Sequence, residues 1–548
     1  MIGFACGAIG VEVAWPVMPA SGSATRQQTA PTCDRSRVAG RCVEQPRLRG
    51  VRRMMLATVP NRYNRYHNVH YPPLGLLYIA AHLRAAGFEV QVVDAAAQGM
   101  DYASLCRAVA DAAPDALGLT CTTHTRLELV EATRALHERL PRLPLVVGGP
   151  HVTFCPQETL ERTPVDVVVM GEGEQKMLRL ARGEAWAEIP GIAYRQNGRI
   201  VINAADGSHC DLATIAPPAR DLVDMQRYPG YRSLGRRNTQ VLSNRGCPFG
   251  CIYCSATFFW GKRTRSVAAE RVVDEITSIV RDYGITGFYF YDDAFTTDKR
   301  KARAVCELLI ERNLRIAWGT STRVDLVDRE LLTLMARAGC RQIDFGLETL
   351  NPAVCAKIGT KATYEQTQEV IAAARQAGIR IITLYLIIGL PGDDPQSLRE
   401  TFARCLSTRA TLLSTQILRI YPGTELESIA RRNGALPAGF GWYDPYDLGM
   451  ENFRTVPIYT EQPREVLLRQ YAFLSKYVRL SSALRQRLPG IGVRMLARIE
   501  PALFRALSAR RREFRSDSRP ASACAQPRLR SRSDGPNAAD SPSAREAG

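Results

Sequence analysis

Short apolar segments alternate with longer amphipathic segments in two stretches of this chain, residues 55–175 and 239–426. Such alternation of strands and helices predicts parallel sheets whose faces are covered by helices. In the first stretch we expect strands at 55–59, 89–93, 116–120, 145–147 and 166–170. In the second we expect strands at 239–243, 287–292, 315–319, 342–347, 380–388 and 413–420, with helices at 266–283, 298–312, 328–338, 364–377 and 395–407. The sequence therefore predicts an α/β protein with two such units, each binding ligands beyond the carboxyl ends of its strands.

Three cysteines follow the first strand of the second stretch: Cys247, Cys251 and Cys254, with Tyr253 directly before the last. Three thiolates on one loop can hold three irons of a [4Fe–4S] cluster and leave the fourth iron open for a small molecule. A structural zinc site would need a fourth ligand from a second cysteine pair or a histidine pair, and this segment offers neither. The run favours a reactive iron–sulfur centre over a structural metal.

The C-x3-C-x-aromatic-C pattern resembles the signature of the radical S-adenosylmethionine (SAM) superfamily. That resemblance implies a partial (β/α)6 barrel, in which the open iron chelates the amino and carboxylate groups of SAM. It also implies a one-electron donor such as flavodoxin or ferredoxin, because one electron cleaves SAM to methionine and a 5′-deoxyadenosyl radical. The first stretch looks like the cobalamin-binding domain that precedes many radical SAM cores, a doubly wound, five-stranded flavodoxin-like sheet.

The resemblance assigns SAM contacts to residues at the strand ends of the second stretch. Asp292 and Asp293 stand where family members contact the SAM amino group, and a carboxylate beside an ammonium is a charge-assisted contact. Arg323 suits the SAM carboxylate through its planar fork. The remaining predicted contacts are Tyr253, Glu348 and Gly389, the last in a segment that approaches the adenine. Each of these residues has an alternative role in a solvated turn or in a salt bridge within the barrel.

The cobalamin contacts that the resemblance implies lie at the strand ends of the first stretch: Pro73, Gly75, Thr122, Gly148, Gly149, Gly171, Glu172 and Gly173. Glycines there would let a ligand approach the backbone closely, although short turns also contain glycine for other reasons. The D-x-H-x-x-G motif, whose histidine ligates cobalt in other cobalamin domains, does not occur in this sequence. His124 and His151 are alternatives as ligands, and we favour surface or supporting roles for both.

The ends of the chain differ from its middle in composition. The net charge is +18, and the Arg-, Ser- and Pro-containing flanks supply about half of that excess, so we expect solvated tails and not a nucleic-acid partner. We divide the chain into a disordered or non-native extension (1–53, with the native start at Met54 or Met55), a cobalamin-binding domain (54–204), a linker (205–238), a radical SAM core (239–426), a helical substrate cover (427–510) and a disordered basic tail (511–548). No segment is long and apolar enough to span a bilayer, and peripheral contact with a membrane stays open.

The first functional hypothesis is a cobalamin-dependent radical SAM methyltransferase that acts on an unactivated carbon of a secondary metabolite or lipid. The second is an oxidative cyclase or ring-rearranging enzyme that uses the same cofactors. A distant third is a zinc- and nucleic-acid-binding protein. An oxygen-sensitive cluster requires reduced thiolates, so we expect a cytoplasmic enzyme.

Overall fold

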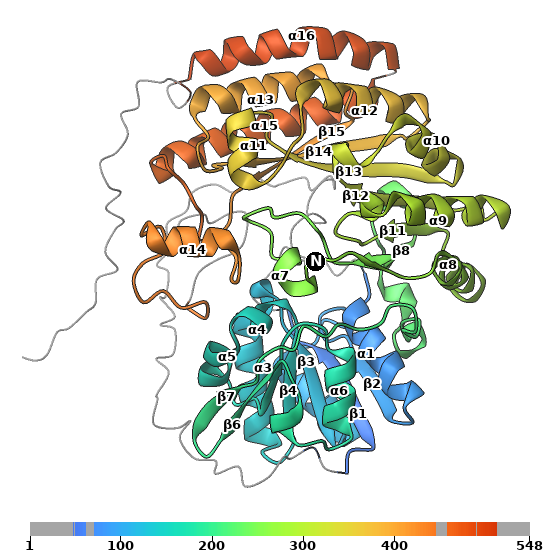
Figure 1. Cartoon of the computed structure of the whole chain (residues 1–548), viewed down its shortest axis with the longest axis vertical. Coiled ribbons are helices and arrows are strands. Elements are labelled where there is room, and N and C mark those ends of the chain that lie inside the picture. The colour runs from blue at the N-terminus through green and yellow to red at the C-terminus, as the bar shows by residue number, and fades with distance from the viewer. Residues whose placement is uncertain are drawn as a thin grey trace, which may run out of the picture.

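The computed structural model describes residues 48, 50–61, 71–444, 457–488, 490–511 and 514. The predictions for most of the extension and of the basic tail lie outside these residues. Two α/β units are stacked along the long axis of the molecule, and the C-terminal helix α16 (Gly490–Ala509) covers the far end (Figure 1). The predicted α/β fold class is confirmed.

The first unit is built on a seven-stranded sheet in the order β2-β1-β3-β4-β5-β6-β7. Its first five strands are parallel and have the 2-1-3-4-5 order of flavodoxin-like folds. The hairpin β6–β7 adds two antiparallel strands beside β5, and it turns at Asn197 and Gly198, which both have positive φ. The strands are β1 (Arg53–Thr58), β2 (Glu89–Val93), β3 (Ala116–Thr120), β4 (Leu145–Gly148), β5 (Val167–Val169), β6 (Ile192–Gln196) and β7 (Arg199–Ile202).

Helices cover both faces of this sheet, as its buried strands require. Local sequence sets where several of them begin: Asp101 caps α2 by accepting from the Ser104 N–H, and proline opens α4 and α5. The helices are α1 (Leu74–Ala85), α2 (Tyr102–Ala112), α3 (Arg126–Arg139), α4 (Pro150–Phe154), α5 (Pro156–Arg162) and α6 (Glu174–Ala181).

The second unit contains six parallel strands that lie in chain order, β8-β11-β12-β13-β14-β15. These strands are β8 (Asn238–Val241), β11 (Gly287–Phe290), β12 (Ala317–Thr322), β13 (Cys340–Glu348), β14 (Ile381–Ile388) and β15 (Leu412–Ile417). The connecting helices are α8 (Ala269–Tyr283), α9 (Lys299–Glu311), α10 (Arg329–Arg337), α11 (Pro352–Ile358), α12 (Tyr364–Gln376) and α13 (Pro395–Ser407). The short helix α11, which the sequence reasoning missed, precedes α12 in the fourth connection.

Two small elements carry the cysteine loop. The strand β9 (Asn244–Arg245) precedes it and pairs with β10 (Arg265–Ser266), and α7 (Ala256–Trp260) follows it. Figure 1 shows α7 between the two α/β units. The loop therefore lies at the boundary between the two α/β units, which we call the seam.

The remaining segments pack onto these units. Residues 205–238, predicted as a linker, bury Cys210, Ile215 and Tyr228 in the same core as the six-stranded unit. The chain ends with α14 (Glu425–Arg432), α15 (Arg464–Arg487) and α16 (Gly490–Ala509). Among the described helices, none combines the length and the apolar character that crossing a bilayer demands.

The two units are joined by polar contacts at the carboxyl ends of the first sheet. Glu158 of α5 accepts from the backbone N–H groups of Trp442 and Tyr443, both at 2.9 Å. Arg126 donates to the Trp442 carbonyl at 2.8 Å. Because segments hundreds of residues apart meet here, the position of the seam is a property of the tertiary structure.

Candidate functional site

The cysteine loop opens into a cavity at the carboxyl ends of the six-stranded unit. The cavity is open to solvent at its mouth. Its lining residues come from the cysteine loop, from the ends of β11, β12 and β13, and from the turn after α11: Cys247, Phe249, Cys251, Tyr253, Cys254, Ala256, Tyr289, Tyr291, Asp292, Asp293, Ala294, Ser321, Thr322, Arg323, Gly346, Glu348 and Thr360.

All three predicted cluster ligands line this cavity. Burial raises the pKa of the Cys247 thiol to about 11 and that of the Cys254 thiol to about 12, and it also raises the pKa of Cys251. Protonated thiols ionise when they coordinate a metal. A tight turn at Gly246, whose φ is +96°, starts the loop; a Cβ there would lie within 3 Å of the Arg263 carbonyl oxygen. The donor set and its confinement fit an iron–sulfur cluster.

Glu348 is the most unusual residue of the cavity. Its φ is +65°, in the left-handed region that a glutamate rarely adopts, and a bulge in β13 occurs beside it. The side chain is 2% exposed, and its Oε2 atom has no hydrogen-bond partner. Burial raises its pKa to about 8, against the opposing effects of a hydrogen bond from Tyr253 and the charge of Arg323. Backbone strain and an orphaned carboxylate oxygen at one residue indicate a ligand-binding role.

Arg323 lies at the same wall of the cavity. Its guanidinium donates to both carboxylate oxygens of Asp325, each at 2.8 Å, and it stacks over the Phe249 ring at 4.0 Å. Its Nη1 atom is 4.0 Å from the Cys251 sulfur. The pair of hydrogen bonds to Asp325 thus fixes the guanidinium with its Nη1 atom toward Cys251.

The structure separates the two aspartates that the sequence placed together. Asp292 accepts from the backbone N–H groups of Ser243 and Asn244, at 2.7 and 3.0 Å, and from the Ser243 hydroxyl. It therefore ties the end of β11 to the segment after β8, and burial raises its pKa to about 7. Asp293 lies near Cys247 and Cys254 and raises the pKa of both thiols. Both aspartates line the cavity, and the hydrogen bonds of Asp292 hold the chain beside Asp293.

The remaining two predicted SAM contacts differ in position. Tyr253 lines the cavity and donates to Glu348. Gly389 is not a lining residue; a Cβ there would lie 3.0 Å from Leu467 Cδ1 of α15. The Gly389 position is thus explained by packing, and its contact with SAM stays a prediction.

The eight predicted cobalamin contacts lie at the carboxyl edge of the first sheet, but their glycines have different surroundings. A Cβ at Gly149 would lie 2.6 Å from the Cys121 carbonyl oxygen, and one at Gly173 would lie 2.8 Å from Ile79. These two glycines permit close packing within the protein. A Cβ at Gly75 would meet nothing within 4 Å, and one at Gly171 would meet only the Lys176 ammonium, at 3.9 Å. Open space beside a glycine is what a ligand approaching the backbone needs, so this edge fits a cobalamin.

The other four residues have identifiable local roles. Pro73 and Thr122 stand at the starts of α1 and of the 3₁₀ turn that precedes α3, where the Thr122 and Thr125 side chains cap the turn reciprocally. Gly148 ends β4, and a Cβ there would be in ordinary contact with Val169. Glu172 belongs to an ion-pair cluster, described next.

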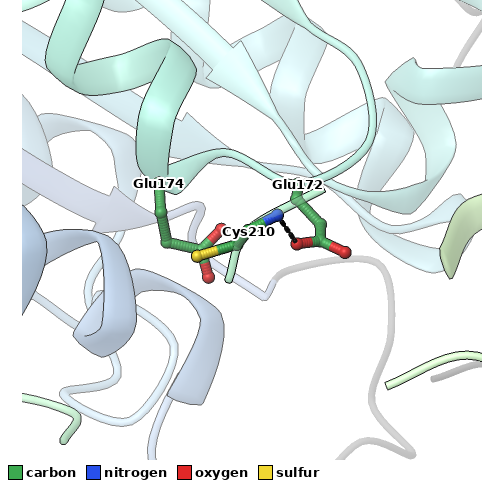
Figure 2. Close-up of side chains that lie close together, drawn as sticks. All are labelled: Glu172, Glu174 and Cys210. Carbon is green, nitrogen blue, oxygen red and sulfur yellow. Dashed lines mark hydrogen bonds between the residues drawn. The ribbon is translucent and has the colours of Figure 1, made fainter. Parts of the chain in front are cut away.

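The side chains of Glu172, Glu174 and Cys210 lie close together (Figure 2). Oxygen and sulfur donors within 4.8 Å of one another could in principle hold a metal. However, Arg245 pairs with Glu172 at 3.3 Å and with Glu174 at 2.7 Å, and Arg265 also pairs with Glu172. The Glu172 carboxylate accepts from the Cys210 N–H as well. These arginines already compensate both carboxylates, so the cluster is an ion-pair site and not a metal site.

The two histidines considered as ligands are placed differently. The His151 ring is fully buried, 3.3 Å from the Thr123 hydroxyl through Nδ1 and edge-on to the Tyr443 ring. Burial lowers its pKa to about 3, so it is neutral. His124 lies beside the Tyr421 ring, at 6.4 Å between centroids. His151 packs between the units and does not line the cavity.

Sequence reasoning missed two groups of residues. Tyr289 donates to Asp344 at 2.7 Å and contacts the Ser321 hydroxyl at the same distance, which forms a buried polar network on the cavity floor. Arg245, two residues before the first cysteine, joins the cysteine loop to the first unit. The alternation of side chains along β12 and β13 could have indicated that Ser321 and Asp344 face inward. No local sequence pattern indicates the partners of Arg245.

Comparison with known proteins gives two domain matches. Residues 67–181 match the B12 binding domain, and residues 241–405 match the radical SAM superfamily. An uncharacterized methyltransferase of Pyrococcus horikoshii is 29% identical over 74% of this chain and 88% of its own length. The anaerobic magnesium-protoporphyrin IX monomethyl ester cyclase of Cereibacter sphaeroides is 29% identical over 65% of this chain, which spans 60% of the cyclase.

A solved structure shows the same fold. The radical SAM methyltransferase TsrM of Kitasatospora setae, with cobalamin and a [4Fe–4S] cluster bound, superposes with a TM-score of 0.61 at 21% identity. The superposition covers 70% of this chain and 79% of TsrM. The fold of this chain is thus a known architecture.

Proposed function

The chain belongs to the radical SAM superfamily and carries a B12 binding domain ahead of its radical SAM domain, and from this premise we propose that it is a cobalamin-dependent C-methyltransferase acting on a metabolite or lipid. The observation that carries the proposal is the cavity at the seam, where the cysteine loop and the orphaned carboxylate of Glu348 face the same space. The similarity to an uncharacterized methyltransferase over 88% of its length supports methyl transfer.

The residues divide the work of holding the cofactors. Cys247, Cys251 and Cys254 would hold the cluster, while Glu348 and Asp293 would receive the SAM ammonium and Arg323 its carboxylate. The open edge beside Gly75 and Gly171 would receive the cobalamin. When bound, the cluster and SAM supply radical chemistry at a carbon and the cobalamin supplies the methyl group.

The protein itself orients these groups and limits access of water. The two hydrogen bonds from Arg323 to Asp325 fix the Arg323 guanidinium. The hydrogen bonds to Asp292 fix the backbone beside Asp293. Phe249, Ala256 and the aromatic rings of Tyr289 and Tyr291 form the apolar part of the wall. A dry, preorganised wall strengthens electrostatic contacts and keeps stray hydrogen donors from the reacting carbon.

A one-electron donor such as flavodoxin or ferredoxin completes the proposal. Lys262 and Arg263 are exposed just after the cysteine loop. An acidic electron carrier would find complementary charge there, close to the cluster ligands.

Isotope transfer tests the proposal. The protein is reconstituted without oxygen, with iron, sulfide and cobalamin, and is then given methyl-labelled SAM, a reductant and a small-molecule extract of the producing cells. We expect the labelled methyl group in a product, and we expect no product with Cys251→Ser. The matched variant Cys306→Ser, a buried cysteine of α9 outside the cavity, should transfer label normally.

The similarity to the anaerobic cyclases favours a second candidate, oxidation or cyclisation with the same cofactors. The same incubation distinguishes the two reactions. Consumption of SAM to 5′-deoxyadenosine with an unlabelled, altered product would support cyclisation and would exclude methyl transfer for that substrate.

A further inference from the structure

Large apolar side chains gather on the outer surface of the C-terminal helices. Within the described residues, eight large hydrophobic side chains are exposed, and six of these belong to α15 and α16. Four lie on α16: Met495, Ile499, Leu503 and Leu507, with exposed fractions of 61, 65, 56 and 41%. Scattered exposed apolar residues need no explanation, but this concentration on one helix does.

The four side chains of α16 form a continuous ridge. They recur every four residues, which places them above one another on one side of a helix. The other side of α16 is buried through Val493, Ala497 and Phe504, and the helix packs on α13. Figure 1 shows α16 at the extreme end of the molecule, beyond α13. The ridge therefore faces away from the body of the protein.

The charge that accompanies the ridge has a single sign. The exposed ionisable residues of α16 are Arg494, Arg498 and Arg505, and Arg510 and Arg511 follow directly. The one acidic residue of the helix, Glu500, is buried and pairs with Arg485 at 2.7 Å. Arg505 pairs with Glu400 of α13, at 3.2 Å. Arg494 and Arg498 stand one helical turn apart on the same flank of the ridge.

We propose that α16 is a membrane-docking helix, which lies flat on a bilayer containing anionic phospholipids. The ridge Met495–Ile499–Leu503–Leu507 inserts into the boundary between headgroups and acyl chains, and Arg494 and Arg498 meet the lipid phosphates. Helices with an apolar face flanked by arginine bind the interface in this orientation without crossing the membrane. Docking is a property of this surface and does not depend on which reaction the cavity carries out.

The charge pattern favours lipid over a second copy of the chain. In a symmetric dimer the same patch of both copies meets itself, so two α16 ridges in contact would bring their arginine flanks together. Like charges in one interface oppose association. An anionic bilayer offers an acyl-chain boundary to the apolar ridge and phosphates to its arginines.

Vesicle binding tests the proposal with the full-length, cluster-reconstituted protein. Sedimentation is measured with vesicles of phosphatidylcholine alone and of phosphatidylcholine mixed with phosphatidylglycerol. We expect binding to the mixed vesicles, weakened roughly tenfold or more by I499Q/L503Q through loss of apolar burial. We expect a loss of similar size for R494Q/R498Q. The matched variant I202Q, which changes an equally apolar exposed side chain on β7, should bind as the wild type does.

Three results would overturn the proposal: no binding of the wild type to mixed vesicles, equal binding by all variants, or a lipid-free dimer in light scattering that I499Q/L503Q converts to monomer. Far-UV circular dichroism and iron content check that each variant is folded and loaded. The changed side chains are exposed, so both should match the wild type. Vesicle binding is read without turnover, and its failure leaves the proposed methyl transfer unaffected.

Discussion

At the scale of single residues, burial decides which ionisable groups are charged. His151 is fully buried between the first unit and the segment around Tyr443, and burial lowers its pKa to about 3. Glu348 is also buried, and its pKa rises to about 8 for the same reason. His151 is therefore neutral near pH 7, where its unperturbed pKa predicts partial protonation. The Glu348 carboxyl holds its proton to a higher pH than a free glutamate, and a cation bound beside it would favour the ionised form.

His151 should make the protein sensitive to acid. Because its pKa in the folded state lies below the unfolded value of about 6.5, the unfolded chain binds the proton first as pH falls. Its contribution to the free energy of unfolding is present above pH 6.5 and is lost toward pH 3, on the order of 4 kcal/mol over the full window.

Urea unfolding between pH 4 and 7.5 measures this effect. The variant His151→Gln should show a flatter dependence of the unfolding free energy on pH than the wild type. His137→Gln, on the half-buried side of α3, serves as the matched control and should keep the wild-type dependence. Equal pH dependence in His151→Gln and the wild type would contradict the expectation.

Glu348→Gln should weaken SAM binding about tenfold, since it replaces a charge-assisted hydrogen bond to the ammonium by a neutral one. Equilibrium binding of SAM to the cluster-reconstituted protein measures the change. Glu330→Gln, at an exposed glutamate of α10, is the control and should bind SAM as the wild type does. An unchanged dissociation constant in Glu348→Gln would remove this residue from the proposed SAM site.

At the scale of elements, the cysteine loop is held from both sides. On one side Asp292 ties the end of β11 to the segment before β9. On the other side Arg245 of β9 pairs with Glu172 and Glu174 of the first unit, and its guanidinium lies over the Tyr78 and Trp260 rings at 5.1 and 5.0 Å. The ion pairs thus set the position of the loop relative to the first sheet.

Arg245→Met should lower the free energy of unfolding by about 3–5 kcal/mol, because it removes the arginine that pairs with the buried Glu174 carboxylate and one of the two that pair with Glu172. Adding Glu174→Gln should restore part of the loss. Arg84→Met is the matched control: it breaks an exposed ion pair with Asp221 and should cost less than about 1 kcal/mol. Urea unfolding compares the variants. A loss in Arg245→Met as small as that in Arg84→Met would mean that the cluster does not fix the loop.

At the scale of the whole molecule, each of the two sheets carries one candidate binding region. The cavity belongs to the second unit, and the open glycine edge belongs to the first. The helix α1 takes part in both, since Leu74 and Tyr78 pack into the core of the second unit while Leu76, Leu77 and Ala80 pack into that of the first. The units are therefore coupled through packing as well as through ion pairs.

Gly75→Leu should abolish cobalamin binding and leave the unfolding free energy within about 1 kcal/mol of the wild type, because a Cβ at this exposed position meets no protein atom within 4 Å and the longer side chain would occupy the open edge. Absorbance of bound cobalamin after gel filtration measures the first effect, and urea unfolding measures the second. Ala110→Leu, at an exposed position of α2, should bind cobalamin normally. Retained binding in Gly75→Leu would place the cobalamin elsewhere.

The sequence by itself determined the elements, because hydrophobic periodicity and capping residues act over a few neighbours. The five predicted core helices and six core strands recur within a few residues of their observed bounds. The cysteine spacing identified the superfamily for the same reason: its ligands lie on one loop. The alternation itself indicated parallel sheets, and the family resemblance implied the flavodoxin-like and (β/α)6 arrangements.

The tertiary structure alone decided what each polar residue contacts. Asp292 and Asp293 are adjacent in sequence, yet one ties two strands together and the other faces the cysteines. Glu172 was expected at a cofactor and is instead bound by arginines more than 70 residues away. Which side of α16 is exposed depends on its packing against α13, because that contact buries the opposite side of the helix. Burial and ion pairing depend on which distant segments meet, and that information is not local in the chain.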